Sequence, residues 1–123
     1  MKNVKLWIII SGICGFTSVA IGAFGAHGLR NVLSPDRLEI YKTGVIYHLL
    51  HSITILAIAL SGQTKYLISA LFFLIGIILF SFSLYLYAVT SAIVFAIITP
   101  FGGISFLIGW LLLIIQAFKE KNS

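Results

Sequence analysis

Charged residues are scarce in this 123-residue sequence: Lys, Arg, Asp and Glu make up 9% of it, against roughly 25% in soluble domains. A soluble domain of this size needs a largely polar surface, and a chain with 60% hydrophobic residues lacks the side chains to build one. The scarcity excludes an ordinary soluble fold and favours a protein that lies in lipid. At this length we expect a single domain covering residues 1–123.

Cysteine and acidic residues are rarer still. Cys14 is the only cysteine, so the chain has no pair for an intrachain disulfide or a cysteine-based zinc motif, and we interpret it as a small buried hydrophobe. The three acids, Asp36, Glu39 and Glu120, all fall outside the long apolar runs. We therefore predict neither a metal site nor a cofactor.

The net charge of +5 does not indicate nucleic-acid binding. That function needs a clustered basic patch, whereas these cations lie at the ends of apolar segments and in short connections, as expected for residues excluded from hydrocarbon and attracted to anionic headgroups. We expect membrane lipids as partners. The eight cations are Lys2, Lys5, Arg30, Arg37, Lys42, Lys65, Lys119 and Lys121.

Four apolar stretches are long enough to cross a bilayer, which takes about 20 residues as a helix. They cover residues 6–26, 43–60, 66–87 and 92–118, and they predict an all-α, four-helix transmembrane bundle. A cleaved secretory leader is the alternative for the first stretch, because Lys2 and Lys5 precede it. Since a leader has an apolar core of only about 7–15 residues, we expect a spanning helix.

Local signals place some of the helix ends. Ser34, Pro35 and Asp36 form a helix start, since serine caps, proline suits the first helical position and aspartate favours the positive end of the dipole. Thr90 and Ser91 predict a tight return. Pro100 lies within the last stretch, where it is expected to kink the helix and free a carbonyl group.

Four passes place both termini on one side of the membrane. That side collects Lys2, Lys5, Lys65, Lys119 and Lys121, and the other collects Arg30, Arg37 and Lys42. By the positive-inside rule, this imbalance predicts cytoplasmic termini in the cell (inner or plasma) membrane.

Small residues recur at helical spacing and predict close helix packing, which drives association in lipid. The stripes could pack within one chain or against a second copy, so a homo-oligomer, or a complex with other membrane proteins, stays open. The small residues are Ser11, Gly15, Ser18, Gly22 and Ala26 in the first stretch, Gly76 in the third, and Gly102 and Gly109 in the fourth.

Polar side chains of the four stretches are expected to gather in the leaflet nearest residues 27–42. Counting ~1.5 Å per helical residue, we expect His51, Ser83 and Thr99 at a similar depth, with His27 at the edge. Ionisable residues in spans often mark function. For His51 both a functional and a packing role stay open, whereas for His48, closer to the interface, a packing role is favoured.

Metal binding by His27, His48 and His51 is a weak alternative, because no acidic or cysteine ligand completes the set. A Ser83–His51 catalytic pair is also disfavoured, since no carboxylate within the span could orient the histidine. We therefore expect the protein not to be an enzyme.

Several motifs resemble a known family. They are GAFGAHGL at residues 22–29, YKTG at 41–44, YHLLH at 47–51, LFSFSLYL at 79–86, ITPFGG at 98–103 and GW at 109–110. Together they resemble the domain of unknown function 423 family of small bacterial membrane proteins, which is related to eukaryotic transmembrane protein 256. The motifs cover all four stretches in order.

The resemblance implies a four-pass inner-membrane protein whose molecular role is not established, and it implies no catalytic residue. It draws attention to positions that match the family motifs, namely His27, Tyr47, His51, Ser81, Ser83, Thr99 and Pro100. The family usually has glutamine where this chain has His48. This departure implies that His48 and His51 do not form a shared metal or proton-relay site.

Two functions remain in competition. The first is an accessory or structural protein that acts through lipid or partner-helix contacts, as the small-residue faces indicate. The second is binding or transport of a small polar molecule, ion or lipid headgroup, as the expected polar layer and the proline in the last helix indicate.

Overall fold

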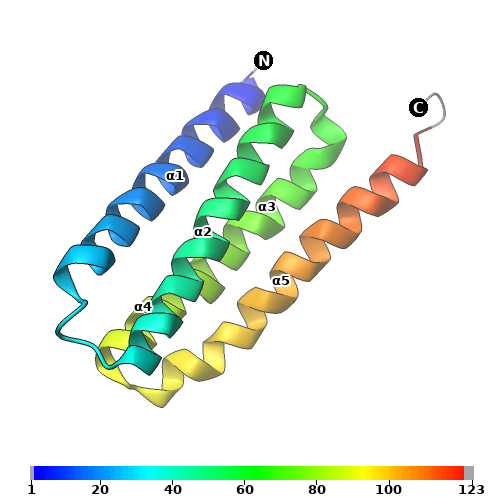
Figure 1. Ribbon diagram of the computed structural model, residues 1–123. Coiled ribbons are helices and arrows are strands. Elements are labelled where there is room, and N and C mark those ends of the chain that lie inside the picture. Colours follow the sequence, from blue (N-terminus) through cyan, green and yellow to red (C-terminus); the bar gives the residue numbers. More distant parts are fainter. Residues whose placement is uncertain (1, 121–123) are drawn as a thin grey trace.

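The computed structural model describes residues 2–120, and they form four long helical rods that run antiparallel (Figure 1). Each rod is long and apolar enough to cross a membrane, and no strand occurs between residues 2 and 120. Both termini lie at the same end of the bundle. The elements are α1 (Lys2–Gly28), α2 (Pro35–Ser61), a 3-10 turn (Thr64–Tyr66), α3 (Leu67–Gly76), a π-helical segment (Ile77–Ser81), α4 (Phe82–Thr90) and α5 (Ile93–Phe118). The third rod, Thr64–Thr90, comprises the 3-10 turn, α3, the π-helical segment and α4.

The helix ends agree with the local signals in the sequence. α2 begins at Pro35, and the side chain of Ser34 accepts a hydrogen bond from the backbone N–H of Arg37 at 3.4 Å. The turn after Thr90 is made by Ser91, whose φ of 64° is left-handed and whose N–H donates to the carbonyl oxygen of Tyr87 at 2.9 Å. These caps satisfy backbone groups that helix ends would otherwise leave unpaired.

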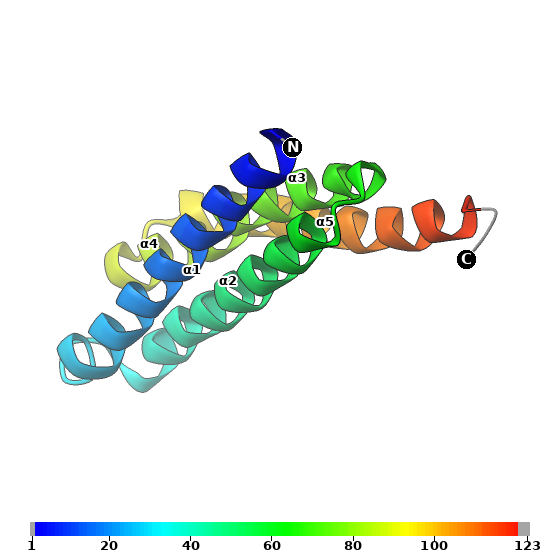
Figure 2. The same cartoon turned by 90° about the horizontal axis from the view of Figure 1, so that it is seen from above.

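The four rods do not all contact one another. α1 packs on α2, which also contacts α3 and α4, while α5 packs on α3, the π-helical segment and α4. The backbones of α2 and α5 stand apart, and they diverge toward one end of the bundle (Figure 2). The bundle thus consists of two helical hairpins. The first is α1–α2 and the second is the third rod with α5, and α2 of the first packs on α3 and α4 of the second.

Glycines set the closest approach between the second hairpin's helices. A Cβ at Gly102 would overlap the backbone nitrogen of Phe80, one at Gly76 would overlap the ring of Phe106, and one at Gly109 would lie 2.6 Å from the ring of Phe73. All three glycines belong to the small residues that the sequence identified for packing. Their missing side chains let α5 lie directly on α3 and the π-helical segment.

The small-residue face of α1 only partly matches the prediction. Ser11 and Ser18 are buried, but Ala26 is exposed and a Cβ at Gly15 would meet nothing within 4 Å. Gly22 does face α2, because its Cβ would lie 3.0 Å from Val45. The expectation was wrong for Ala26. The face of α1 that packs on α2 rotates slightly about the helix axis along α1, so that near Gly28 the buried residue is Gly25 instead.

Gly25 fits against an aromatic side chain of α2. A Cβ at Gly25 would overlap the ring of Tyr41, whose hydroxyl donates to the carbonyl oxygen of Ile21 at 2.7 Å. The glycine therefore lets α2 approach closely enough to place a tyrosine hydroxyl on the backbone of α1.

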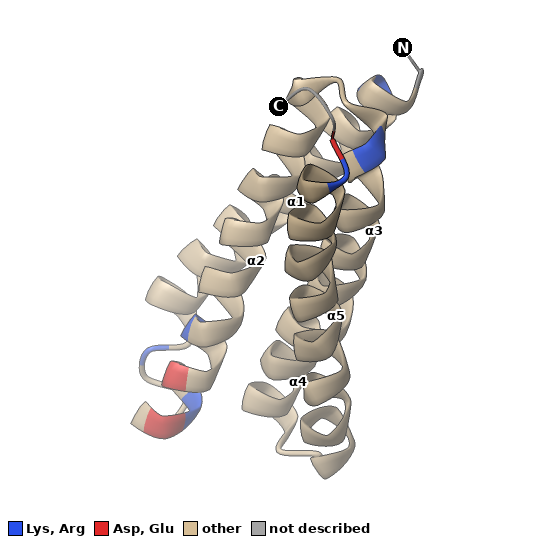
Figure 3. Ribbon diagram, turned by 90° about the vertical axis from the view of Figure 1, so that its right-hand side faces the viewer, with Lys and Arg blue, Asp and Glu red and all other residues tan. Residues whose placement is uncertain are grey.

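Charged residues lie at the two ends of the bundle (Figure 3). At the end that holds the termini, Lys65 forms an ion pair with Glu120 at 2.6 Å, which ties the start of the third rod to the end of α5. At the other end, Arg37 donates to the carbonyl oxygen of Ala88 at 3.3 Å. Lys121, counted among the cations expected at the terminal end, lies outside the described residues.

Two irregularities occur inside the rods. α5 remains one helix from Ile93 to Phe118 despite Pro100, whose missing N–H leaves the carbonyl group one turn earlier without its usual partner. The third rod contains the π-helical segment, Ile77–Ser81. Such segments are frequent at functional sites, and this one faces both Gly44 of α2 and Gly102 of α5.

Candidate functional site

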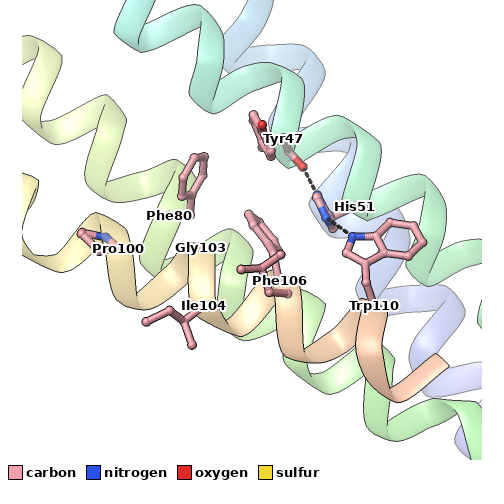
Figure 4. Close-up of a pocket in the computed structure, with 9 residues that line it drawn as sticks. Tyr47, His51, Phe80, Pro100, Gly103, Ile104, Phe106 and Trp110 are labelled. Carbon is pink, nitrogen blue, oxygen red and sulfur yellow. Dashed lines mark hydrogen bonds between the residues drawn. The ribbon is translucent and has the colours of Figure 1, made fainter. Parts of the chain in front are cut away.

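His51 lies between α2 and α5 and uses both of its ring nitrogens (Figure 4). Its Nδ1 lies 2.8 Å from the carbonyl oxygen of Tyr47, one turn earlier in α2, and its Nε2 accepts a hydrogen bond from the indole N–H of Trp110 at 3.0 Å. The imidazole is stacked on Phe106, with ring centroids 3.8 Å apart and an interplanar angle of 14°. His51 therefore connects two helices whose backbones stand apart.

These partners define the protonation state of His51. The indole nitrogen of Trp110 can only donate, and the backbone oxygen of Tyr47 can only accept. The Nε2 atom of His51 must then offer its lone pair, and Nδ1 must carry the proton. In this arrangement the ring is neutral, and it has no free lone pair for a metal ion or for an incoming proton.

A pocket of about 530 Å³ opens beside this histidine, between α2 and α5. Tyr47, Phe80, Phe106 and Trp110 form aromatic walls, and Pro100 and Gly103 of α5 also line it (Figure 4). Tyr47 and Trp110 are 41% and 44% exposed, so the mouth of the pocket lies on the outer surface of the bundle. That surface faces lipid if the helices span a membrane.

His48 is completely buried between the two hairpins. Its Nδ1 lies 2.9 Å from the hydroxyl of Tyr85 in α4, and its Nε2 lies 3.2 Å from the hydroxyl of Thr17 in α1. A neutral imidazole has one donor and one acceptor, and the two hydroxyls can satisfy both. His48 thus links three helices through hydrogen bonds, which is the packing role that the sequence favoured.

Ser83 and Thr99 are brought together, but apart from His51. Their hydroxyl groups lie 2.6 Å from each other and link α4 to α5. Thr99 is eleven residues before Trp110, the partner of His51, which corresponds to about 16 Å along α5. The expectation of a single polar layer is therefore wrong. Counting residues along a helix gives the position of each residue in its own span, but it does not give the axial shift between neighbouring helices.

The remaining residues singled out in the sequence have different environments. His27 is exposed near the end of α1, and Pro100 is exposed at the pocket. Ser81 is fully buried at the end of the π-helical segment, where its hydroxyl has no hydrogen-bond partner among the described residues. Of these three, only Pro100 lines the pocket that His51 also lines.

The described residues form neither the three-histidine metal site nor the serine–histidine pair that the sequence raised as alternatives. Among residues 2–120 no three His, Cys, Asp or Glu side chains converge as a metal site would require. Ser83 is bonded to Thr99 rather than to His51, so the serine–histidine pair that was considered is not formed. The carboxylates lie at the ends of the bundle.

Sequence reasoning missed the partners of both histidines, Thr17, Tyr85 and Trp110. A signal was present, because each is a polar side chain within an apolar run and needs a hydrogen-bond partner in lipid. The same signal applies to Ser105, which donates to the carbonyl oxygen of Phe72 at 2.7 Å. Pairing these residues would have required the axial positions of the helices.

Comparison with known proteins identifies a family match. The family described as a protein of unknown function (DUF423) matches residues 21–103. This region includes the end of α1, all of α2 and the third rod, and α5 as far as the pocket residue Gly103. It therefore contains both histidines of α2, together with Tyr85 and the Ser83–Thr99 pair.

Individual relatives are similar over nearly the whole chain. A UPF0382 membrane protein of Haemophilus influenzae is 44% identical over 125 residues, covering 99% of each chain. The UPF0382 membrane protein YwdK of Bacillus subtilis is 37% identical, covering 94% of this chain and 98% of its own. The UPF0382 inner membrane protein YgdD of Escherichia coli is 37% identical, covering 96% and 93%. No solved structure matches the chain.

Proposed function

This chain belongs to the DUF423 family, whose relatives are named as membrane proteins, and on that premise we propose that it is a non-enzymatic accessory or structural protein that acts through contacts with lipids and partner helices. It is a small membrane protein with four helices long enough to span the bilayer. The partners of its lipid and helix contacts, and the effect of those contacts, are what we propose.

The observation that carries the proposal is the complete use of His51 inside the fold. Its nitrogens are occupied by Tyr47 and Trp110, and His48 is likewise held by Tyr85 and Thr17. Polar groups within a membrane that bond to each other in this way act as links between helices. General acid–base catalysis needs a group that can exchange a proton with a substrate, and these histidines are engaged elsewhere.

The outer helices supply surface for such contacts. Within the most apolar window of each helix, 17% of the residues are buried in α1 and 22% in α5, against 39% in α2 and 39% in the third rod. Large apolar side chains such as Phe16, which is 76% exposed, and Leu107, which is 70% exposed, cover these faces. They suit lipid tails or a helix of another protein, including a second copy of this chain.

Complementation tests the proposal. In a host that lacks the gene, the His51→Gln protein should restore the growth or membrane phenotype of the deletion as fully as the wild type does. Glutamine can accept the hydrogen bond from Trp110 with its amide oxygen but cannot act as an acid or base near neutral pH. A His51→Gln protein that melts at the wild-type temperature yet restores nothing would contradict a purely structural role.

The orientation that accompanies the proposal places both termini in the cytoplasm, as the charge imbalance between the two ends favours. Reporter fusions at the C-terminus and in the loop between α1 and α2 test it. A cytoplasmic reporter should be active at the C-terminus and inactive in the loop, and the reverse pattern would refute the orientation.

A further inference from the structure

The pocket between α2 and α5 contains a polar group that the fold leaves unused. Tyr47 lines the pocket, and its hydroxyl has no hydrogen-bond partner among residues 2–120. It lies four residues inside the apolar stretch 43–60, or about 6 Å along the helix from the start of that stretch. An unpaired hydroxyl within the hydrocarbon region is costly because hydrocarbon offers no acceptor.

The pocket is too small to hold a helix within it. Ten residues of helix, with a diameter of about 10 Å and a length of about 15 Å, fill roughly 1,200 Å³. The pocket holds about 530 Å³, which falls in the range of about 300–1,000 Å³ that is typical of small-molecule sites. The occupant is a small molecule or the end of a larger one.

The walls favour a flat ring. Tyr47 contacts Phe80 with ring centroids 4.8 Å apart and is stacked with Phe106 at 6.1 Å and 20°, while Phe106 also meets Phe80 edge-on at 5.4 Å. On the α5 side Gly103 has no side chain, and a Cβ there would touch only Phe80, at 3.8 Å. Flat aromatic walls with an open backbone beside them leave room for a planar group to stack.

We propose that this pocket binds a membrane-dissolved quinone, with the ring lying between Tyr47 and the open backbone at Gly103 and a quinone carbonyl oxygen accepting the hydrogen bond of the Tyr47 hydroxyl. The mouth lies among the exposed side chains Ile104, 53%, and Leu107, 70%, so the ligand enters sideways from the bilayer. The site is independent of the accessory role above and holds whether or not that role is correct.

Other ligands fit less well. Among the described residues, none that lines the pocket carries a formal charge, so neither an ion nor a charged headgroup finds a counter-charge. A saturated acyl chain fills apolar space but brings no acceptor for Tyr47 and gains little from flat walls. A quinone head is uncharged and planar, and it carries two acceptor oxygens.

The two tryptophans make the site measurable. Trp110 lines the pocket, whereas Trp7 lies in α1 and is not among the residues that line it. In the Trp7→Phe protein, reconstituted in phospholipid nanodiscs, decylubiquinone should quench the fluorescence of Trp110 along a saturable curve. In the Trp110→Phe protein, Trp7 should show only the linear quenching that a quinone dissolved in the bilayer produces.

Variants in the Trp7→Phe background test the contacts. Tyr47→Phe removes one hydrogen bond and should raise the Kd roughly three- to tenfold. Gly103→Leu should abolish saturation by filling the pocket, whereas Gly12→Leu, at a glycine whose Cβ would meet nothing within 4 Å, should leave the Kd unchanged. If Gly103→Leu fails to fold, Ile104→Phe adds bulk at the rim of the pocket without adding a tryptophan and should have the same effect.

Each outcome decides between the alternatives. Linear quenching in every protein overturns the proposal, because it means partition without a site. Saturable quenching that Tyr47→Phe and the pocket-filling variants leave unchanged also overturns it, because the quinone then binds elsewhere. Native mass spectrometry from quinone-containing nanodiscs should show a bound quinone, and retention of phospholipid alone would identify the pocket as an acyl-chain site instead.

Discussion

Trp110 of α5 donates its indole N–H to Nε2 of His51 on α2 over 3.0 Å, across a boundary at which the two helix backbones stand apart. The bond links the two hairpins on the side of the bundle that carries the pocket. Because tryptophan can only donate, it also fixes which nitrogen of His51 holds the proton. One contact therefore affects stability, protonation and the shape of the pocket.

Replacing Trp110 with phenylalanine should destabilise the bundle by removing this hydrogen bond. Hydrogen bonds between helices in membrane proteins contribute about 0.6 kcal/mol on average and up to about 1.7 kcal/mol. Unfolding in bicelles should show a loss in that range beyond the loss caused by Trp7→Phe. Trp7→Phe is the control because Trp7 forms no hydrogen bond among the described residues. Equal losses in the two variants would mean that the bond contributes nothing.

The tautomer of His51 is open to direct measurement. With Trp110 donating to Nε2 and Tyr47 accepting from Nδ1, the ring should be neutral with its proton on Nδ1. Solid-state NMR of ¹⁵N-histidine-labelled protein in bilayers at neutral pH should show a protonated Nδ1 and an unprotonated Nε2, and His51→Gln identifies the signals. A proton on Nε2 would show that the bond from Trp110 is absent in lipid.

Substitutions at His48 should separate hydrogen bonding from bulk. His48→Leu leaves the hydroxyls of Tyr85 and Thr17 without their partner in a fully buried site, and it should cost about 1–3 kcal/mol of unfolding free energy. His48→Gln keeps one donor and one acceptor and should cost clearly less. Denaturation in bicelles measures both free energies of unfolding. Equal losses in the two variants would mean that His48 contributes only by filling space.

Gly102 and Gly103 are neighbours on α5 that should respond in opposite ways to alanine. A Cβ at Gly102 would overlap the backbone of Phe80, whereas one at Gly103 would lie 3.8 Å from the Phe80 ring. Gly102→Ala should cost about 1–3 kcal/mol or prevent folding. Gly103→Ala should be neutral or stabilise the helix by up to about 1 kcal/mol. Melting temperatures in detergent give the comparison, and a tolerated Gly102→Ala would show that α5 can move away from the third rod.

Much of the fold was accessible from the sequence, because lipid imposes simple requirements. Apolar length fixes the number of spans, and the cap formed by Ser34 and Pro35 fixes the start of α2. The predicted spans fall short of the helices at most ends, since the helices continue beyond the apolar stretches. The π-helical segment, Ile77–Ser81, had no sequence signal, because it depends on how the third rod packs on its neighbours.

The candidate site was harder to predict than the fold. The spacing of Gly44, His48 and His51 at i, i+4 and i+7 places them on one face of α2, and all three are buried. It could not show that Trp110 rather than Ser83 or Thr99 is the partner of His51, because axial shifts between helices come from side-chain packing. The glycines Gly76, Gly102 and Gly109 set that packing, but each had to be placed against a particular aromatic side chain or backbone first.

The linkage between the two hairpins imposes an order on biosynthesis. Tyr85 follows His48 by 37 residues, and Trp110 follows His51 by 59. At about 5–20 residues per second, a ribosome that has just added His51 needs roughly 3–12 s to reach Trp110. At the start of that interval the newly made α1–α2 hairpin contains two histidines without their later partners, and Tyr85 is added before Trp110. The imidazole bonds that join the hairpins are thus completed only when the last helix enters the membrane.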